Sequence, residues 1–533
     1  MKSLIPLSLL AAIAAAPVQA QVLTVCLEAA PEVFNPEVTS NGSTMYVLNQ
    51  MYDTLVSVER GGSGIENALA ESWSVSEDGK TYTFNLRKDV AWQSNELFTP
   101  TRTFNADDVM FTFMRMFDKE HAYNAVGGGN YPTFNGKLAD LLEGIEKIDD
   151  YTVAFKLKTP YAPFIGLMAH GSFGITSGEY ADVLAAAGTP EQIDLKPIGT
   201  GPFQLQAYQT DSIVRQIPFA ETWGAKIGDK NRTPLVDAVV MAISSDATVR
   251  LQRALAGECL IGLYPNLADK ATIEASDNLN AIVAPVASTG FLHFNFRDER
   301  FQDVRVRKAL AQAIDMENFV EIVYSGMAEP TGAVVPRALW AHAADIKPHE
   351  YDVEAAKALL AEAGVSDLKV ELWAVPVARS YVPNGRRAAE IVQADWAAIG
   401  VQAEIVTYEW AEYVSRARKG EAQIGMFGGI YDFPDPSQIP NNYLTCNEEG
   451  KPAPSNIGAW CNDEYNAVMR EAGQITDKAA REALYIKAQE IVHGDVPVIV
   501  MGGADDVVAV SKSVEGYAPA IFGTPRLSGV TVK

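Results

Sequence analysis

The chain has 533 residues, of which 48% are hydrophobic and 21% are charged, a composition typical of folded globular proteins and not of disordered or fibrous ones. Because one hydrophobic core stops growing at about 250 to 300 residues, a chain of this length should form roughly two or three compact units. The formal net charge is −24, which argues against a nucleic-acid partner, since nucleic acids require a basic face. We interpret the acidity as a source of solubility rather than as an attraction for cationic ligands.

The first twenty residues have the pattern of a secretory signal. Lys2 supplies the positive end, Leu4 to Ala16 the apolar run, and Val18-Gln19-Ala20 a small-x-small cleavage site. The apolar run is too short to cross a bilayer, and no later segment reaches about 18 apolar residues. We therefore expect a signal peptide over residues 1–20. Because Gln21 stands where a lipoprotein would need cysteine, we expect a free periplasmic protein that does not span the membrane.

Four cysteines follow the signal, at Cys26, Cys259, Cys446 and Cys461. Export permits disulfides, and four cysteines allow three pairings, among which the sequence alone does not choose. A bridge between Cys446 and Cys461 is the simplest, because closing a loop of about 15 residues stabilises the fold by about 3 kcal/mol. Zinc is the rival interpretation, but no Cys-x-x-Cys pair or closely spaced histidine accompanies these residues. We expect no metal site.

The first third of the chain has the pattern of strands joined by turns. Residues 73–76 lead into a turn at Glu77-Asp78-Gly79-Lys80, and residues 81–87 then alternate apolar and polar side chains. This alternation predicts a half-buried strand that follows a hairpin turn.

Between Leu368 and Asp432 the pattern changes to alternating strands and helices. It predicts strands over 368–372, 401–405 and 423–428, separated by helices over 386–399 and 409–418. The unit is therefore βαβαβ, the order typical of a parallel sheet in an α/β protein.

Further helices are predicted over residues 304–314, 352–363 and 477–492. The second of these begins at Asp352, whose side chain can cap the helix, and ends before Gly364. No internal repeat or long linker interrupts the chain.

Two opposite charges follow strands of the βαβαβ unit, and in open α/β sheets ligands bind beyond the carboxyl ends of strands. Arg379 follows the first strand and Asp432 the third. A peptide is a zwitterion, so an arginine can bind its carboxylate with two parallel hydrogen bonds while an aspartate accepts from its ammonium. Gly428 and Gly429 would let a peptide backbone approach the third strand closely. We therefore predict a binding site for zwitterions at this edge.

Several segments are close to sequences known from one family. They are Leu69–Trp73, Ser76–Phe84, Asn105–Val109, Pro197–Leu205, Val306–Leu310, Gln393–Trp396, Gly400–Ala403 and Ile405–Trp410. Along essentially the whole chain after the signal, the sequence resembles the family 5 extracytoplasmic solute-binding proteins, and the segments from Gln393 onward resemble those members that bind dipeptides.

The resemblance implies an α/β fold, a two-lobed periplasmic-binding-protein clamp of type II, cluster C-like, with an extra subdomain in lobe I. It also implies a receptor that captures dipeptides or other short peptides and delivers them to an inner-membrane ABC permease. We expect a monomer without a cofactor. The implied division is 1–20 signal peptide; 21–52, 200–285 and 505–533 lobe I main subdomain; 53–199 lobe I extra subdomain; and 286–504 lobe II.

The resemblance also assigns roles to single residues. It places Asp432 where the family binds the ligand's α-amino group and Arg379 where it binds the carboxylate. Ser40-Asn41-Gly42 aligns with a loop that contributes backbone contacts to the ligand. The pairing that it implies for the cysteines is Cys26 with Cys259 and Cys446 with Cys461.

The chain departs from the family's dipeptide binders around Asp432. Tyr431, Phe433 and Pro434 replace smaller or more polar residues, and Gly429 replaces a bulky aromatic residue. The size of the pocket is therefore open, and longer peptides or haem remain alternative ligands. For haem, the six histidines show no spacing that singles out an iron ligand.

A secreted hydrolase is the alternative from another functional class. It would need a nucleophile or a metal constellation, yet the sequence contains neither a Gly-x-Ser-x-Gly elbow nor a His-Glu-x-x-His motif. We therefore expect a binding protein with no catalytic residues.

Overall fold

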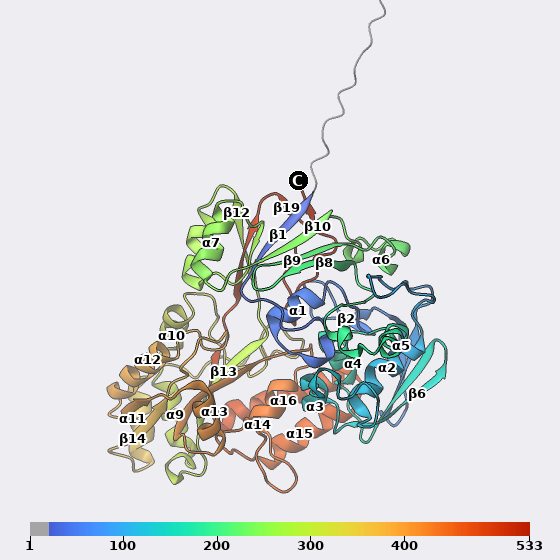
Figure 1. Cartoon of the computed structure of the whole chain (residues 1–533). Helices are drawn as coiled ribbons and strands as arrows, with labels where there is room; N and C mark the ends of the chain where they lie inside the picture. The colour runs from blue at the N-terminus through green and yellow to red at the C-terminus, as the bar shows by residue number, and fades with distance from the viewer. Residues whose placement is uncertain (1–20) are drawn as a thin grey trace, which may run out of the picture.

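The computed structural model describes residues 21–533, and the predicted signal peptide over residues 1–20 lies outside the described residues. A seven-stranded sheet lies at the top in Figure 1 and contains both the first strand and part of the C-terminal region. Its central strand β1 (Val22–Leu27) pairs in parallel with both of its neighbours. The order is β12 (Leu279–Ala284), β18 (Asp506–Ser511), β11 (Ile261–Gly262), β1, β10 (Ala238–Ile243), β9 (Ile213–Pro218) and β8 (Phe203–Gln209).

Short helices accompany this sheet, and a small ribbon lies near its C-terminal strands. The helices are α1 (Gly42–Leu48), α6 (Trp223–Lys226), α7 (Ala247–Leu255) and α8 (Lys270–Glu274). The ribbon consists of β19 (Val514–Glu515) and β20 (Thr531–Val532). Cys26 in β1 forms a disulfide with Cys259, which precedes β11, with 5.7 Å between the Cα atoms. The predicted pairing of these two cysteines is confirmed.

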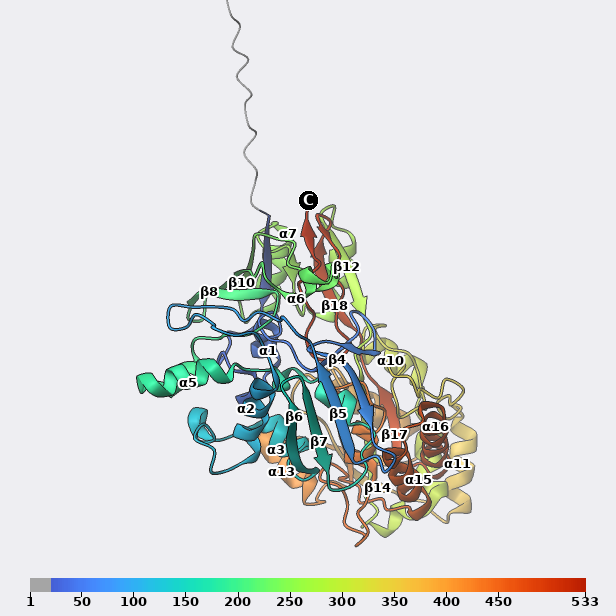
Figure 2. The ribbon, with the colours of Figure 1, turned by 90° about the vertical axis from the view of Figure 1, so that its right-hand side faces the viewer.

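An antiparallel four-stranded sheet lies at the lower right in Figure 1 and faces the viewer in Figure 2. The predicted hairpin is confirmed, because Trp73 in its edge strand pairs with Phe84 across the turn. The order is β4 (Ala70–Val75), β5 (Thr81–Leu86), β7 (Thr152–Leu157) and β6 (Leu142–Asp149). The accompanying elements are β2 (Val56–Val58), β3 (Ile65–Asn67), α2 (Ala106–Phe117), α3 (Pro132–Lys137), α4 (Phe164–Met168) and α5 (Gly178–Ala187).

A mixed five-stranded sheet organises the region at the lower left in Figure 1. The predicted βαβαβ unit is confirmed, because the strand of residues 369–373 pairs in parallel with both other strands of the unit. The order is β15 (Gln402–Val406), β14 (Lys369–Trp373), β16 (Ile424–Ile430), β13 (Ser288–Phe294) and β17 (Val498–Gly502).

The helices predicted for this region lie within three residues of the expected bounds. Their apolar faces pack into the largest hydrophobic cluster, whose members include the fully buried Trp373 and Trp396. The predicted helices are α9 (Val304–Gln312), α11 (Val353–Glu362), α12 (Gly385–Ala398), α13 (Trp410–Arg418) and α16 (Lys478–Asp495). The region also contains α10 (Met316–Val323), α14 (Gln438–Leu444) and α15 (Asp463–Gln474), which were not predicted.

The chain passes between the seven-stranded and five-stranded sheets at two places, from β12 to β13 and from β17 to β18. The second crossing carries Asp505, which pairs with Arg337, followed by Asp506. Burial, together with the neighbouring Asp505 and Glu28, raises the pKa of Asp506 from 3.8 to about 6. Acidic groups therefore gather where the two sheets are joined.

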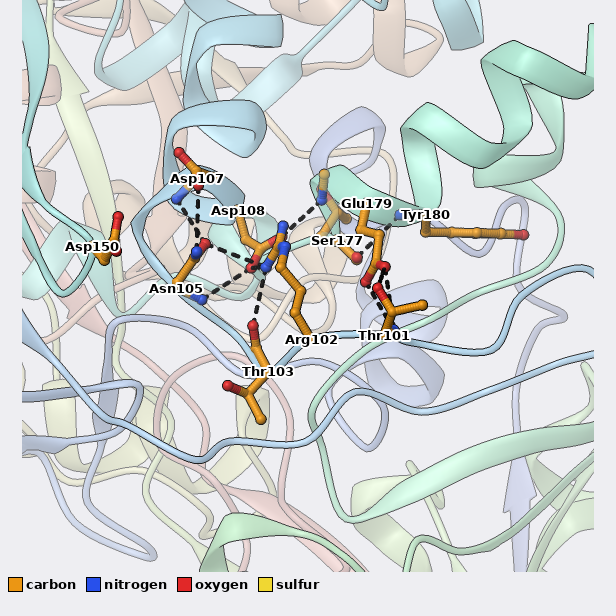
Figure 3. A network of polar contacts seen from close by, with 12 residues as sticks. Thr101, Arg102, Thr103, Asn105, Asp107, Asp108, Asp150, Ser177, Glu179 and Tyr180 are labelled. Carbon is orange, nitrogen blue, oxygen red and sulfur yellow. Dashed lines mark hydrogen bonds and ion pairs between the residues drawn. The ribbon is translucent and has the colours of Figure 1, made fainter.

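The segment Asn105–Val109 begins α2 and takes part in a second polar network (Figure 3). Asn105 and Asp108 form a capping box at the start of α2. The carboxylate of Asp108 also accepts two hydrogen bonds from Arg102, of 2.6 and 2.7 Å, and one of 2.9 Å from the amide of Gly178 in α5. One buried carboxylate thus joins two helix N-termini to the preceding loop.

We predict that Asp108→Ala lowers the free energy of unfolding by about 2–4 kcal/mol. The substitution removes a cap and leaves the Gly178 amide and the Arg102 guanidinium without their acceptor. Chemical denaturation monitored by circular dichroism measures this difference. The matched control is Asp107→Ala, because Asp107 is 54% exposed and pairs with Lys147, so its loss should cost at most about 1 kcal/mol. Equal losses in the two variants would contradict the prediction.

We also predict that Asp506→Asn stabilises the protein in a pH-dependent manner. A carboxyl group whose pKa is raised by folding contributes stability below its unfolded pKa, and this contribution is lost as the pH rises through the folded pKa. The gain of the variant over the natural protein should therefore grow by about 2 kcal/mol between pH 4 and pH 7.5. Denaturation at several pH values checks this, with the exposed Asp211→Asn as control. A gain that stays constant with pH would refute it.

Candidate functional site

A cavity of about 690 Å³ lies where the loops after the five-stranded sheet face the loops after the N-terminal strands. Its size is within the range of pockets that hold small ligands. Among the residues predicted from the sequence, Arg379, Asp432, Ser40 and Gly42 line this cavity, whereas Asn41, Gly428 and Gly429 do not. The structure thus brings together the two predicted charges and part of the predicted N-terminal loop.

Arg379 lies in the loop between β14 and α12. A tight turn holds its backbone, because the amides of Arg379 and Val382 donate to each other's carbonyl oxygens at 3.1 and 3.0 Å. The guanidinium carbon lies 4.9 Å from the centre of the Trp410 ring, a distance at which a cation and an aromatic face attract each other. The turn and the indole together orient a planar group with several N–H donors toward the cavity.

The other arginines of the cavity wall are already engaged. Arg232 and Arg526 both pair with Glu66, Arg232 in a very short contact and Arg526 at 2.7 Å. Within residues 21–533, Arg379 forms no ion pair with a carboxylate. Arg379 is therefore the cavity's cation that remains available for an anionic group of a ligand.

Asp432 lies in the loop between β16 and α14, and its side chain is 41% exposed. Its Oδ2 atom accepts a hydrogen bond of 2.7 Å from the amide of Gln438 and lies 2.7 Å from the Nζ atom of Lys137. The Gln438 carbonyl in turn accepts from the Asp432 backbone amide at 2.9 Å. Gln438 thus holds both ends of the residue in place.

The charge states of Asp432 and the adjacent His170, which form one corner of the cavity, follow from their surroundings. Burial alone would raise the pKa of Asp432, but the Lys137 ammonium and the hydrogen bonds to Asp432 outweigh it and lower the pKa. Burial lowers the pKa of the adjacent His170 to about 4. At neutral pH the corner therefore presents a carboxylate beside an uncharged imidazole.

A buried ion pair anchors the loop that carries Asp432. Asp435 accepts from the backbone amide of Ser437 at 3.0 Å and from its hydroxyl at 2.7 Å. Its other oxygen lies 2.6 Å from Arg481 on α16, and Arg481 also donates to the Tyr485 hydroxyl at 2.8 Å. Because both charges are almost fully buried and their hydrogen bonds are satisfied, this loop has a defined shape before any ligand arrives.

The N-terminal loop is fixed in a similar way. Asn41 caps α1 by accepting from the Thr44 amide at 3.0 Å, which explains why its side chain does not line the cavity. Just upstream, the fully buried Glu37 pairs with Arg115 at 3.1 Å. The loop therefore presents Ser40 and Gly42 to the cavity from a rigid base.

The two glycines of β16 have a different environment from the one expected. A Cβ atom on Gly428 would lie 2.4 Å from the carbonyl oxygen of Thr289, and one on Gly429 would lie 2.4 Å from the side chain of Ile439. Both positions need glycine because protein atoms already occupy the space beside them. The room that Gly429 leaves is filled by Ile439 and Tyr443 and does not enlarge the cavity.

Phe433, one of the departures noted in the sequence, points away from the cavity. Its ring is 3% exposed and belongs to the hydrophobic cluster of the four-stranded sheet. A Cβ atom on Gly166 of α4 would touch it at 3.5 Å. Tyr431, by contrast, does line the cavity.

Sequence patterns did not indicate three residues that lie beside Asp432: Lys137, His170 and Gln438. Gln438 lies six residues after Asp432, and a polar side chain at the start of a helix near a predicted ligand contact was the only available signal. Lys137 and His170 belong to other segments that only tertiary packing brings to Asp432.

Among the described residues, no three His, Cys, Asp or Glu side chains are grouped so as to hold a metal ion. Within residues 21–533, no helix is both long and apolar enough to cross a membrane.

Comparison with known proteins places this geometry in a family. Residues 64–451 match the family model of bacterial extracellular solute-binding proteins, family 5, middle region. The chain is 41% identical to the dipeptide-binding protein of Escherichia coli K12 over 99% of this chain and 97% of the relative. It is 38% identical to heme-binding protein A of Haemophilus influenzae, over 95% and 91% of the two chains.

A solved structure extends the comparison to the fold. The dipeptide binding protein from Pseudoalteromonas sp. SM9913 in complex with Met-Leu superimposes with a TM-score of 0.75 at 33% identity, covering 96% of this chain and all of that one (100%). The expected α/β, two-lobed clamp is therefore confirmed. With a family model that matches most of its length and a relative of 41% identity along 99% of it, the chain belongs to family 5 of the bacterial extracellular solute-binding proteins.

Proposed function

We propose that this chain is the substrate-binding component of a dipeptide ABC importer, which captures short peptides outside the cytoplasm and delivers them to an inner-membrane permease. The observation that carries the proposal is that Arg379, a cation without a carboxylate partner among residues 21–533, and the carboxylate of Asp432 line the same cavity. Two fixed opposite charges match the two ends of a zwitterion. The similarity to a dipeptide-binding protein supports the same ligand class.

In this proposal Arg379 binds the ligand's carboxylate, and Trp410 keeps the guanidinium plane in position for two parallel hydrogen bonds. Asp432 accepts from the ligand's ammonium. Ser40 and Gly42, which also line the cavity, provide polar and backbone contacts. A binding protein of this kind needs no catalytic residue, and none is assigned.

We favour dipeptides over longer peptides because of the space at Asp432. The replacement that could have enlarged the pocket, Gly429, does not do so, since the side chains of Ile439 and Tyr443 fill the room beside it. The larger Phe433 lies in a separate apolar cluster and leaves the cavity unchanged. Tyr431 lines the cavity, and its side chain is buried in the core of the five-stranded sheet. The length of the ligand is thus limited by protein atoms at this end.

We further propose that residues 21–52, 200–285 and 505–533 form the main part of lobe I, 53–199 its extra subdomain, and 286–504 lobe II. The separate sheets and hydrophobic clusters support this division. Because the proposed ligand contacts come from both lobes, a bound peptide would favour the closed arrangement over the open one.

We further propose where the protein is exported and that it acts as a monomer. Removal of residues 1–20 would release a monomer beginning at Gln21 into the periplasm. There the two disulfides of the structure, Cys26–Cys259 and Cys446–Cys461, can form and persist. The permease would then recognise the closed, loaded form.

Haem is the second candidate, because a relative is a heme-binding protein and because His170 lines the cavity. The hydrogen bonding of His170 argues against it as an iron ligand. Its Nδ1 atom accepts from the Ser172 amide at 3.1 Å, which places the proton of the neutral ring on Nε2. A ligand to iron needs a lone pair on the nitrogen that faces the cavity, so the geometry favours a peptide.

We predict that the natural ligand of the protein is a short peptide. If the protein is purified without denaturation and its small molecules are released and identified by mass spectrometry, short peptides, mainly dipeptides, should be recovered. Recovery of only sugars, metal chelates or haem would contradict the proposed function. Absorption spectra of the same preparation test haem directly.

We also predict that the charges of Asp432 and Arg379 both contribute to the affinity for a dipeptide. Asp432→Ala and Arg379→Ala should each weaken the binding of dialanine at least about tenfold, because each leaves one charged end of the ligand without its partner. Isothermal titration calorimetry measures the affinity, and thermal unfolding confirms that both variants fold. Arg386→Ala is the matched control, since this arginine follows the same loop but its side chain is 76% exposed. Unchanged affinity in both site variants would remove the assignment.

A further inference from the structure

The carboxylate proposed to hold the ligand's ammonium already has a cation of the protein beside it. Lys137 is the last residue of α3, in the region of the four-stranded sheet, whereas Asp432 follows β16 of the five-stranded sheet. The Nζ atom of Lys137 lies 2.7 Å from Oδ2 of Asp432. The ion pair therefore joins two regions that are far apart in the sequence, at the ligand contact itself.

The position of Lys137 is set by more than this one contact. Its Nζ atom lies 5.7 Å from the centre of the Phe433 ring, within the range of a cation–π attraction. Phe433 is in turn buried in the cluster of the four-stranded sheet. Lys137 does not line the cavity, although Asp432 does. The lysine thus pairs with a carboxylate of the cavity wall without itself lining the cavity.

A ligand ammonium that reaches Asp432 must therefore share it. If the ion pair persists, two ammonium groups lie within about 5 Å of each other and repel, because a distance this short is not screened by salt. If the ion pair breaks, Lys137 loses its carboxylate, and the contact between the two regions is lost as well. Either course reduces the affinity for a ligand with a free ammonium.

We propose that Lys137 is a specificity-determining residue that weakens the hold of Asp432 on the ligand's ammonium and so shifts recognition toward the carboxylate end at Arg379. The inference rests on the proposed function and deepens it. Without Lys137, the Asp432 carboxylate would still accept the hydrogen bond from Gln438, and its whole negative charge would be available to the ligand's ammonium. With Lys137, the same carboxylate discriminates less between ligands that carry an ammonium and ligands that do not.

The test compares Lys137→Met with the natural protein. Methionine keeps an unbranched apolar chain beside Phe433 and removes the ammonium, and with it the ion pair to Asp432. Binding of dialanine and of N-acetyl-dialanine is measured by calorimetry, and Lys119→Met, an exposed lysine of the same region, is the matched control. We expect Lys137→Met to bind dialanine roughly three- to tenfold more tightly, because one repulsion between like charges at short range is removed. Lys119→Met should change the affinity less than twofold.

The acetylated ligand separates a charge effect from an effect on lobe movement. Its affinity should change less than twofold, because it carries no ammonium. Equal tightening of both ligands would overturn the proposal, since a change in lobe movement acts on both alike. Unchanged or weaker binding of dialanine by Lys137→Met would also overturn it. If neither protein binds dialanine, the proposed function itself fails, which is a different result.

Discussion

The parallel pairing of β14 and β16 is the constraint on which the candidate site depends. Leu372 pairs with Ile424 and Trp373 with Gly425, so the two strands run side by side in one direction and their following loops leave the same edge of the sheet. This brings Arg379 and Asp432 to one cavity although about fifty residues separate them. The helices between the strands pack into the common core, so the relative position of the two charges is set by the most buried part of the fold.

Rigidity of the two loops comes from polar groups that the fold buries. The Asp435–Arg481 pair under the Asp432 loop and the Glu37–Arg115 pair beneath the N-terminal loop are both almost fully buried. A buried charge is stable only when its partner is present. Such pairs therefore contribute less to net stability than to defining one conformation, and a site with preformed geometry loses less entropy when it binds its ligand.

Much of this architecture was predictable from local patterns. Alternating apolar residues gave the hairpin at residues 77–80, and helical spacing with Asp352 and Gly364 at its ends gave α11, because these features depend on neighbours in sequence. The topology of the βαβαβ unit then placed Arg379 and Asp432. Packing between distant segments was not predictable: nothing in the sequence indicates that Lys137 reaches Asp432, or that Ile439 fills the space beside Gly429. The disulfide between Cys26 and Cys259, 233 residues apart, came from family resemblance and not from spacing.

The burial of Phe433 in the cluster of the four-stranded sheet has a mechanical consequence. The loop that bears Asp432 is anchored by Asp435 to α16 of its own region and by Phe433 to the region of the four-stranded sheet. A rotation of the lobes that withdrew this ring would expose a whole aromatic side chain, at a cost of about 2 kcal/mol. Rotations about an axis close to this loop avoid that cost. The end of the cavity at Asp432 would then act as the pivot, while the walls farther from it travel the greatest distance.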